Sequence, residues 1–134
     1  MKRQMGERID YSRVHFTGPV PHDTMLTARS LSWAHVYYTY PFVLSWSSLE
    51  SMACEVVFVG SDTPPVRDVV EPGKNGLLVD LFDVAALSQA LIEACRHPER
   101  FAAMRREARR FVVEHYDQRR SCLPAWLKVI EDLL

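Results

Sequence analysis

Short apolar runs alternate with amphipathic segments along the first part of the chain. The runs with strand composition lie at 14–18, 34–40, 55–60 and 77–79. The run at 55–60 is apolar almost throughout and ends at Gly60, which is typical of a strand covered on both faces of a parallel sheet. Helical spacing of the apolar residues predicts helices over 21–31 and 46–53, and residues 64–70 predict a single helical turn.

The pattern becomes helical throughout from Asp83 onward. Asp83 is expected to cap a helix that ends at His97-Pro98, and a second helix is expected to run to about residue 116. A third helix is expected over 117–134, which Pro124 either begins or kinks because it has no amide hydrogen. Alternating strands and helices predict an α/β fold: an open, mostly parallel, Rossmann-like sheet with flanking helices and three C-terminal helices.

Length and charge narrow the classes of function. The 134 residues predict one domain, and 16 basic against 17 acidic residues argue against a nucleic-acid binder, which usually has a strongly basic surface. Four arginines at helical spacing leave that alternative open, but the glutamates among them favour a solvated, salt-bridged helix face. These arginines are Arg105, Arg106, Arg109 and Arg110, and the glutamates are Glu107 and Glu114.

Cysteine and histidine usage predicts neither disulfides nor a metal. Cys54, Cys95 and Cys122 lie in apolar segments without metal-ligand spacing, so we expect buried thiols in a reducing compartment. The histidines show no metal-ligand spacing either. No apolar run is long enough to span a membrane and the first residues do not form a signal peptide, so we expect a cytoplasmic protein.

Three loops are candidates for a ligand site, because open parallel sheets bind ligands beyond the carboxyl ends of their strands. They are the loops 18–22, 40–48 and 60–65. In the second loop, free amides at the start of the following helix suit a phosphate group, and the hydroxyls of Ser45, Ser47 and Ser48 could add hydrogen bonds. Glu50, one turn into that helix, could accept hydrogen bonds from a pair of sugar hydroxyls. From these residues alone, capping serines and a solvated glutamate explain the pattern better.

Four segments and the helices that follow them resemble one family in order and spacing. The segments are Phe16-Thr17-Gly18-Pro19-Val20, Ser48-Leu49-Glu50-Ser51-Met52-Ala53-Cys54, Gly60-Ser61-Asp62 and Asn75-Gly76-Leu77-Leu78-Val79. They resemble the C-terminal domain of family-four (group 1) glycosyltransferases, whose GT-B fold consists of two facing Rossmann-like domains. The polar first residues predict a lead-in at 1–13, and helical spacing predicts a C-terminal helix at 117–134. The resemblance implies a partial nucleotide-sugar-binding domain at 14–116.

The resemblance also implies roles for individual residues. The family pattern has two glutamates separated by seven residues; Glu50 matches the second, which binds the ribose of the nucleotide, and Phe42 stands where the first contacts the transferred sugar. Phe42 either packs against a sugar face or fixes the loop in the core. Ser47 matches a serine near the diphosphate, with Ser45, Ser48 and Leu49 beside it. Gly18 and Val20 match the loop that approaches the base.

The reaction implied by the resemblance is a retaining transfer of a sugar from a nucleotide-diphosphate sugar to an acceptor, without a metal. The cationic pair of the family, an Arg and a Lys, has no match before Val14, and we expect these 134 residues not to include the facing acceptor domain. We therefore expect little turnover from this chain alone, an exposed sheet edge, and completion by an N-terminal domain or a separate chain. The alternative is a catalytically silent remnant or interaction module with the same fold.

Overall fold

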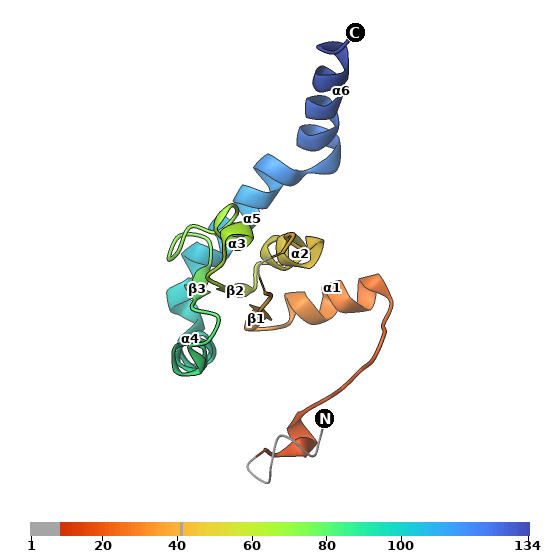
Figure 1. Cartoon of the computed structure of the whole chain (residues 1–134). Helices are drawn as coiled ribbons and strands as arrows, with labels where there is room; N and C mark the ends of the chain where they lie inside the picture. Colours follow the sequence, from red (N-terminus) through yellow and green to blue (C-terminus); the bar gives the residue numbers. More distant parts are fainter. Residues whose placement is uncertain (1–8, 41) are drawn as a thin grey trace.

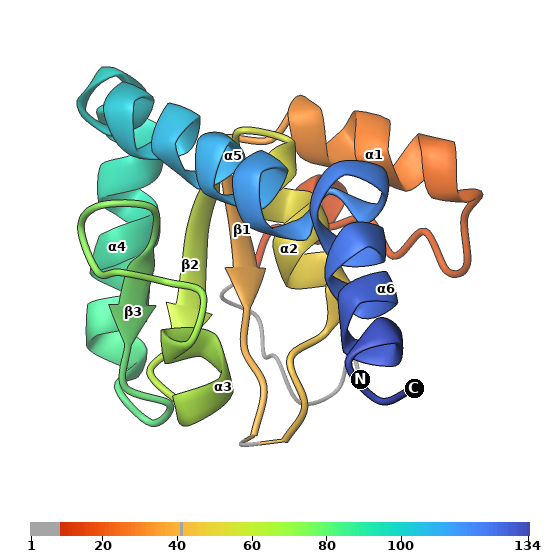
Figure 2. The same cartoon turned by 90° about the horizontal axis from the view of Figure 1, so that it is seen from above.

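The computed structural model describes residues 9–40 and 42–134. Three strands, β1 (Ala34–Tyr37), β2 (Val57–Ser61) and β3 (Leu77–Val79), form one parallel sheet in the order β1-β2-β3 (Figures 1 and 2). The register pairs Ala34 with Val57 and Val59 with Leu77. The predicted open, parallel α/β architecture is confirmed.

The helices follow the strands in the predicted order. They are α1 (His22–Ser30), α2 (Trp46–Ala53), the single turn α3 (Pro64–Arg67), α4 (Val84–Arg96), α5 (Ala102–Tyr116) and α6 (Leu123–Glu131). Three short turns join them to the rest of the chain: η2 (Tyr11–Arg13), η3 (Pro98–Phe101) and the π-helical η4 (Gln118–Cys122). Asp83 caps α4 as predicted, because its carboxylate accepts the Ala86 N–H at 2.8 Å.

Helices cover both faces of the central strand. Phe58 of β2 packs in one core with Met52 of α2 and Ala108 of α5, and its neighbours Val57 and Val59 pack in the other core with Ala94 of α4. Figure 2 shows α4 and α5 on opposite sides of the sheet. Since successive side chains of a strand point to opposite faces, β2 is buried along its whole length, as its apolar composition predicted.

Gly60 is required by this packing. A β-carbon at this position would lie 2.8 Å from Cε1 of Phe58 and 2.9 Å from Cγ1 of Val66, closer than carbon atoms approach. The side chains of Phe58 and Val66 can therefore pack next to position 60 only if the residue there has no side chain.

Two arginines of α5 satisfy the C-terminal end of α2. Arg109 donates to the Ala53 carbonyl at 2.5 Å, and Arg105 donates to the Glu55 carbonyl. On the outer face of α5, Arg110 bridges Glu107 and Glu114. Cationic side chains are favourable at the carbonyl end of a helix, so Arg105 and Arg109 have a structural explanation.

Several expectations were wrong. Residues 14–18 form no strand; they are part of an extended connection into α1, beyond the sheet that begins at β1. A β-strand forms only where a neighbouring strand can hydrogen bond to it, and the composition of residues 14–18 does not provide such a neighbour. The cysteines are not buried: Cys95 is exposed, and Cys54 and Cys122 are partly exposed. Residues 1–8 of the lead-in, and Pro41, which was expected to end the second strand, lie outside the described residues.

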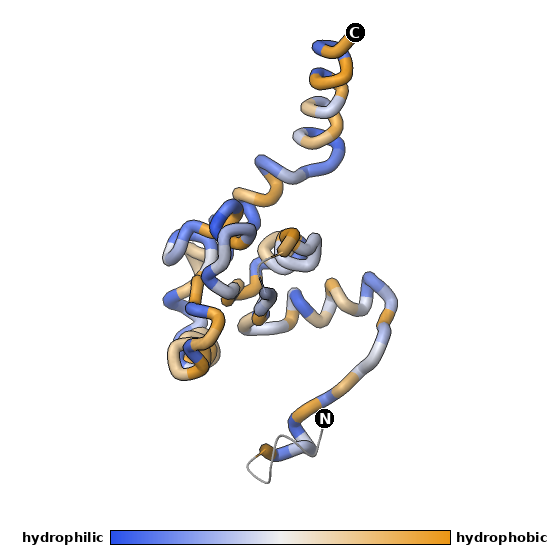
Figure 3. Tube along the Cα trace, viewed as in Figure 1, coloured by the Kyte–Doolittle hydropathy of each residue, from blue (hydrophilic) through white to orange (hydrophobic). Residues whose placement is uncertain are grey.

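The C-terminal helix α6 follows α5 after the turn η4. Pro124 stands in the first turn of α6, so it begins this helix and does not kink it. The change of direction after α5 occurs at Asp117, which has extended backbone dihedrals (Figure 1). Figure 3 shows apolar residues along α6, and Trp126, Ile130 and Leu133 are all exposed. In the part of the chain that the structure describes, no helix is both long and apolar enough to cross a membrane.

Candidate functional site

The loop between β1 and α2 is the candidate that the structure supports best. It leaves the carboxyl end of β1 at Tyr38, earlier than the predicted strand end at Tyr40, and enters α2 at Trp46, as predicted. The hydroxyl of Tyr37 accepts the Ser45 N–H at 2.9 Å, and this bond fixes the end of the loop against the sheet. The N-terminus of α2, with its partial positive charge, therefore begins close to the ligand-binding edge of the sheet.

The serines at this helix start bond mainly to one another and to the backbone. Ser45 is the N-cap: its Oγ accepts the Ser47 N–H at 3.2 Å and lies 2.9 Å from Ser47 Oγ. Ser48 is fully buried and donates to the Ser45 carbonyl at 2.5 Å. Leu49 packs against the core formed by α2, β2 and α5. Ser45 and Ser47 are thus the serines that a ligand can reach.

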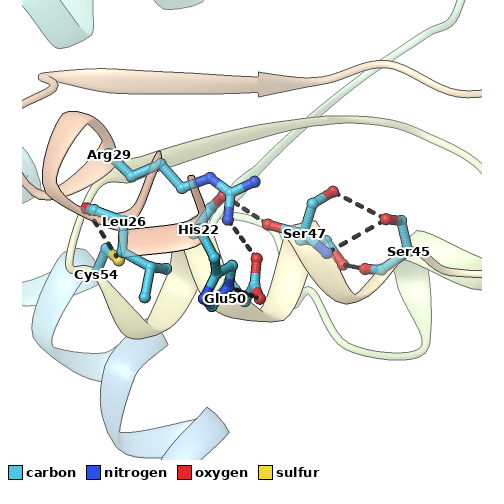
Figure 4. Close-up of polar contacts among 9 residues, drawn as sticks. His22, Leu26, Arg29, Ser45, Ser47, Glu50 and Cys54 are labelled. Carbon is cyan, nitrogen blue, oxygen red and sulfur yellow. Dashed lines mark hydrogen bonds and ion pairs between the residues drawn. The ribbon is translucent and has the colours of Figure 1, made fainter. Parts of the chain in front are cut away.

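Glu50 lies in α2 and is held by two side chains of α1 (Figure 4). Its Oε1 lies 2.8 Å from Nε2 of His22, and its Oε2 accepts a hydrogen bond from Nη1 of Arg29 at 2.5 Å. The His22 hydrogen bond is the largest cause and lowers the pKa of Glu50. Burial, the next largest cause, raises it, and Arg29 lowers it again, so the net shift is downward. The carboxylate is therefore ionised and fixed in position at neutral pH.

A groove of about 660 Å3 runs beside this carboxylate, between α1, α2 and α5. Its lining includes Glu50, His22 and Cys54 at one part, and Arg105 and Arg109 where α5 approaches α2. Burial raises the pKa of the Cys54 thiol, so the thiol is protonated and does not compete with Glu50 for positive charge. The groove thus presents the carboxylates of Glu50 and Glu55 together with Arg105 and Arg109, whose guanidinium groups already bond to the C-terminal end of α2.

Gly18 and Val20 lie in the extended connection that enters α1. Gly18 has a φ of +64° and nothing within 4 Å of where a β-carbon would be, so its glycine is needed for the backbone conformation and not for space. Val20 is 39% exposed and lies two residues before His22, which contacts Glu50. The contact between His22 and Glu50 brings the end of this connection towards α2.

Phe42 is exposed. Its side chain is 79% accessible, in a loop where Tyr40 and Trp46 are exposed as well. The interpretation of Phe42 as a residue that fixes the loop in the core was therefore wrong. Because the side chain at position 42 is exposed to solvent, packing within the described chain does not require an aromatic residue there. A carboxylate at the same position would be hydrated.

Sequence reasoning missed Arg29 and His22. In α1 the structure leaves the apolar Ala28 exposed and buries the charged Arg29 to 9% accessibility. A charged residue inside an amphipathic helix has the same local pattern whether it is solvated or paired, so no local signal identifies its partner. Within residues 9–40 and 42–134, no three His, Cys, Asp or Glu side chains come together in a group that could hold a metal ion.

Comparison with known proteins identifies the family. The sequence pattern of the family described as "Glycosyl transferases group 1" matches residues 2–111. No curated protein matches the chain. Among solved structures, sucrose-phosphate synthase from Thermosynechococcus elongatus superposes with a TM-score of 0.79 at 25% identity, over 91% of this chain and 30% of that protein.

A second solved protein, HepE of Anabaena, has the same fold. Its structure with UDP and glucose gives a TM-score of 0.76 at 19% identity over 98% of this chain, and its structure with UDP-glucose gives 0.66 at 17% over 79%. This chain spans only 28–34% of the length of these proteins. The structural neighbours are GT-B glycosyltransferases, and the family pattern matches most of the sequence. The chain therefore belongs to the group 1 glycosyltransferases.

Proposed function

We propose that this chain supplies the nucleotide-binding wall of a glycosyltransferase that moves a sugar from a nucleoside diphosphate sugar to an acceptor, with retention of configuration at the sugar. Glu50 binds the two ribose hydroxyls, the loop at Gly18 and Val20 approaches the base, and the start of α2 with Ser45 and Ser47 faces the diphosphate. The observation that carries the proposal is the ionised Glu50 carboxylate, held by His22 close to the end of the Gly18–Val20 connection.

The placement of α2 supports a diphosphate at its N-terminus. Departure of the nucleoside diphosphate builds negative charge, and preorganised dipoles stabilise such charge without having to reorient. Ser45 Oγ already accepts a hydrogen bond from the Ser47 N–H. A phosphate oxygen that approaches this helix would therefore bond to the Ser45 and Ser47 hydroxyls and compete with Ser45 Oγ for that N–H. Following the family resemblance, the proposal includes no metal ion and a cytoplasmic location.

The acceptor side of the cleft lies outside these 134 residues in this proposal. Transfer requires a facing wall that positions the acceptor and excludes water, and that wall would come from another domain or chain. Uridine nucleotides are the first ligands to test, because HepE was solved with UDP and with UDP-glucose. The sugar and the acceptor are left open, and Phe42 replaces the carboxylate that the family uses at the sugar.

Thermal unfolding in the presence of nucleotides tests the proposal. A ligand at one hundred times its dissociation constant stabilises the folded state by about 2.7 kcal/mol, which raises Tm by several degrees. We expect uridine or guanosine diphosphate to raise Tm for the native chain and not for Glu50→Gln. Glu114→Gln is a matched control, because it removes a carboxylate from an exposed ion pair on α5. Absence of any nucleotide effect would favour the second candidate, a catalytically silent module, which the exposed Phe42 in place of the first glutamate also favours.

A further inference from the structure

The two partners of Glu50 differ in how firmly the fold holds them. Arg29, near the C-terminal end of α1, has a side chain that is 10% exposed, and its Nη1 lies 2.5 Å from Oε2 of Glu50. His22, the first residue of the same helix, has a side chain that is 58% exposed, and its Nε2 lies 2.8 Å from Oε1. One carboxylate oxygen is thus paired with a buried charge, and the other with a side chain that can turn into solvent.

Burial determines the side from which a ligand can approach. The Glu50 side chain is 28% exposed, and Arg29 occupies its buried side. A ribose must therefore approach Glu50 from the side where His22 lies. Figure 4 shows His22 in contact with the carboxylate on this side. Each carboxylate oxygen can accept two hydrogen bonds, so one ribose hydroxyl can share Oε2 with the buried Arg29. On the exposed side, the His22 ring occupies the direction from which the second hydroxyl would approach Oε1.

The cost of moving each partner is unequal. Withdrawal of Arg29 would leave a buried positive charge without its partner, which is strongly unfavourable. An exposed histidine–carboxylate contact contributes little to stability, so its loss is easily offset by a new hydrogen bond to the same oxygen. We infer that Arg29 is a positioning residue that stays paired with Glu50 when nucleotide binds, and that His22 competes with the ribose for Glu50 and leaves Oε1 on binding. This inference rests on the proposed function.

The competition predicts effects of opposite sign for the two partners. His22→Ala removes the competitor, and the full chain should bind uridine diphosphate about twofold to fivefold more tightly, the range expected from loss of an exposed ion pair. Arg29→Lys replaces the planar guanidinium by a point charge on a shorter side chain, and the affinity should fall about tenfold. His97→Ala is a matched control, since His97 also faces a glutamate, Glu99, but at the connection between α4 and α5. Its affinity should equal that of the native chain.

The probe that separates positioning from general destabilisation is 2′,3′-dideoxyuridine diphosphate, which lacks both ribose hydroxyls. Measured by isothermal titration calorimetry, the gain in His22→Ala and the loss in Arg29→Lys should appear with uridine diphosphate and vanish with the dideoxy analogue. A variant that is merely less stable would lose affinity for both nucleotides. His22 is exposed, so His22→Ala tests the inference even if Arg29→Lys folds poorly.

The outcomes separate this inference from the proposed function. If the native chain prefers uridine diphosphate to the dideoxy analogue but His22→Ala binds it no more tightly, the competition is overturned and the ribose role of Glu50 stands. If the native chain binds neither nucleotide, or both equally, the ribose role is overturned and the competition with it.

Discussion

Ser61, the last residue of β2, is hydrogen bonded in both directions to Thr39, which lies just beyond the end of β1. Its Oγ donates to the Thr39 carbonyl at 3.1 Å and accepts the Thr39 N–H at 3.3 Å. Ser61 is fully buried, so no water replaces these bonds at its side chain. The pair fixes the first residues of the loop that leads to α2, and it thereby connects the sheet to the helix that carries Glu50.

Ser61→Ala should therefore destabilise the protein. The substitution removes the partner of both backbone groups of the half-buried Thr39, and leaving polar groups inside the protein unsatisfied costs about 1–3 kcal/mol. Urea unfolding followed by circular dichroism measures the change. Ser88→Ala is the control, because the Ser88 hydroxyl bonds to the Val84 carbonyl on the exposed face of α4 and its loss should change stability by less than about 0.5 kcal/mol. Equal effects of the two substitutions would contradict the role given to Ser61.

The local parts of this fold were predictable from the sequence. The apolar run around Val59 indicates a buried strand, and Asp83 indicates the start of α4. Both could be predicted because both signals depend only on neighbouring residues. The loop between β1 and α2 could be placed at the carboxyl edge of the sheet for the same reason. The short boundary shift of β2, which ends at Ser61 and not at Gly60, is within what a pattern can resolve.

The contacts of the candidate site were not predictable. Glu50 bonds to Arg29 and His22 across 21 and 28 residues of sequence, and these pairings exist only because α1 packs against α2. The wrong prediction of a strand at 14–18 has a related cause. Residue composition gives only a preference for extended backbone, and a strand forms only where a neighbouring strand is available for pairing. The C-terminal helix was predicted, but helical spacing does not reveal what covers its apolar residues, and Trp126 and its neighbours remain exposed.

The stability of the Glu50 interactions should depend on pH. The pKa of Glu50 is lower in the folded state than its ordinary value, first because of the His22 hydrogen bond and then because of Arg29. The unfolded state therefore takes up this proton first as the pH falls, and stabilisation by Glu50 is complete above about pH 5 and lost through the folded-state pKa below it.

Comparison of the native chain with Glu50→Gln over pH 3 to 7 checks this expectation. The substitution should cost about 1–3 kcal/mol at neutral pH, because Arg29 loses a charged partner, and the difference should shrink towards pH 3 as the native carboxylate is protonated. Unfolding free energies from urea titrations at each pH provide the measurement. A difference that stays constant over this range would show that the charge of Glu50 does not stabilise the fold.

Glu55→Gly should stabilise the protein. Glu55 follows the C-terminal cap of α2 with a φ of 55°, a left-handed conformation that costs most side chains about 1–2 kcal/mol and glycine much less. Its carboxylate contributes little, since it lies 3.6 Å from Nε of Arg109 with both side chains exposed to solvent. We expect a net gain of about 0.5–1 kcal/mol in thermal or urea unfolding. Glu55→Ala, which loses the same carboxylate but keeps a β-carbon, should give no such gain.

Deletion of residues 123–134 should leave the core intact. The main contacts of α6 are with the preceding turn η4, and its apolar residues, among them Trp126 and Ile130, are exposed. Figure 3 shows the C-terminal helix extending away from the rest of the fold. The shortened chain should therefore keep its Tm within a few degrees and lose helical signal only in proportion to α6. Exposed apolar surface promotes association, so the full chain should bind 8-anilinonaphthalene-1-sulfonate and self-associate more than the shortened one in analytical ultracentrifugation. A cooperative loss of structure on deletion would mean that α6 stabilises the sheet domain through contacts that its exposed position does not show.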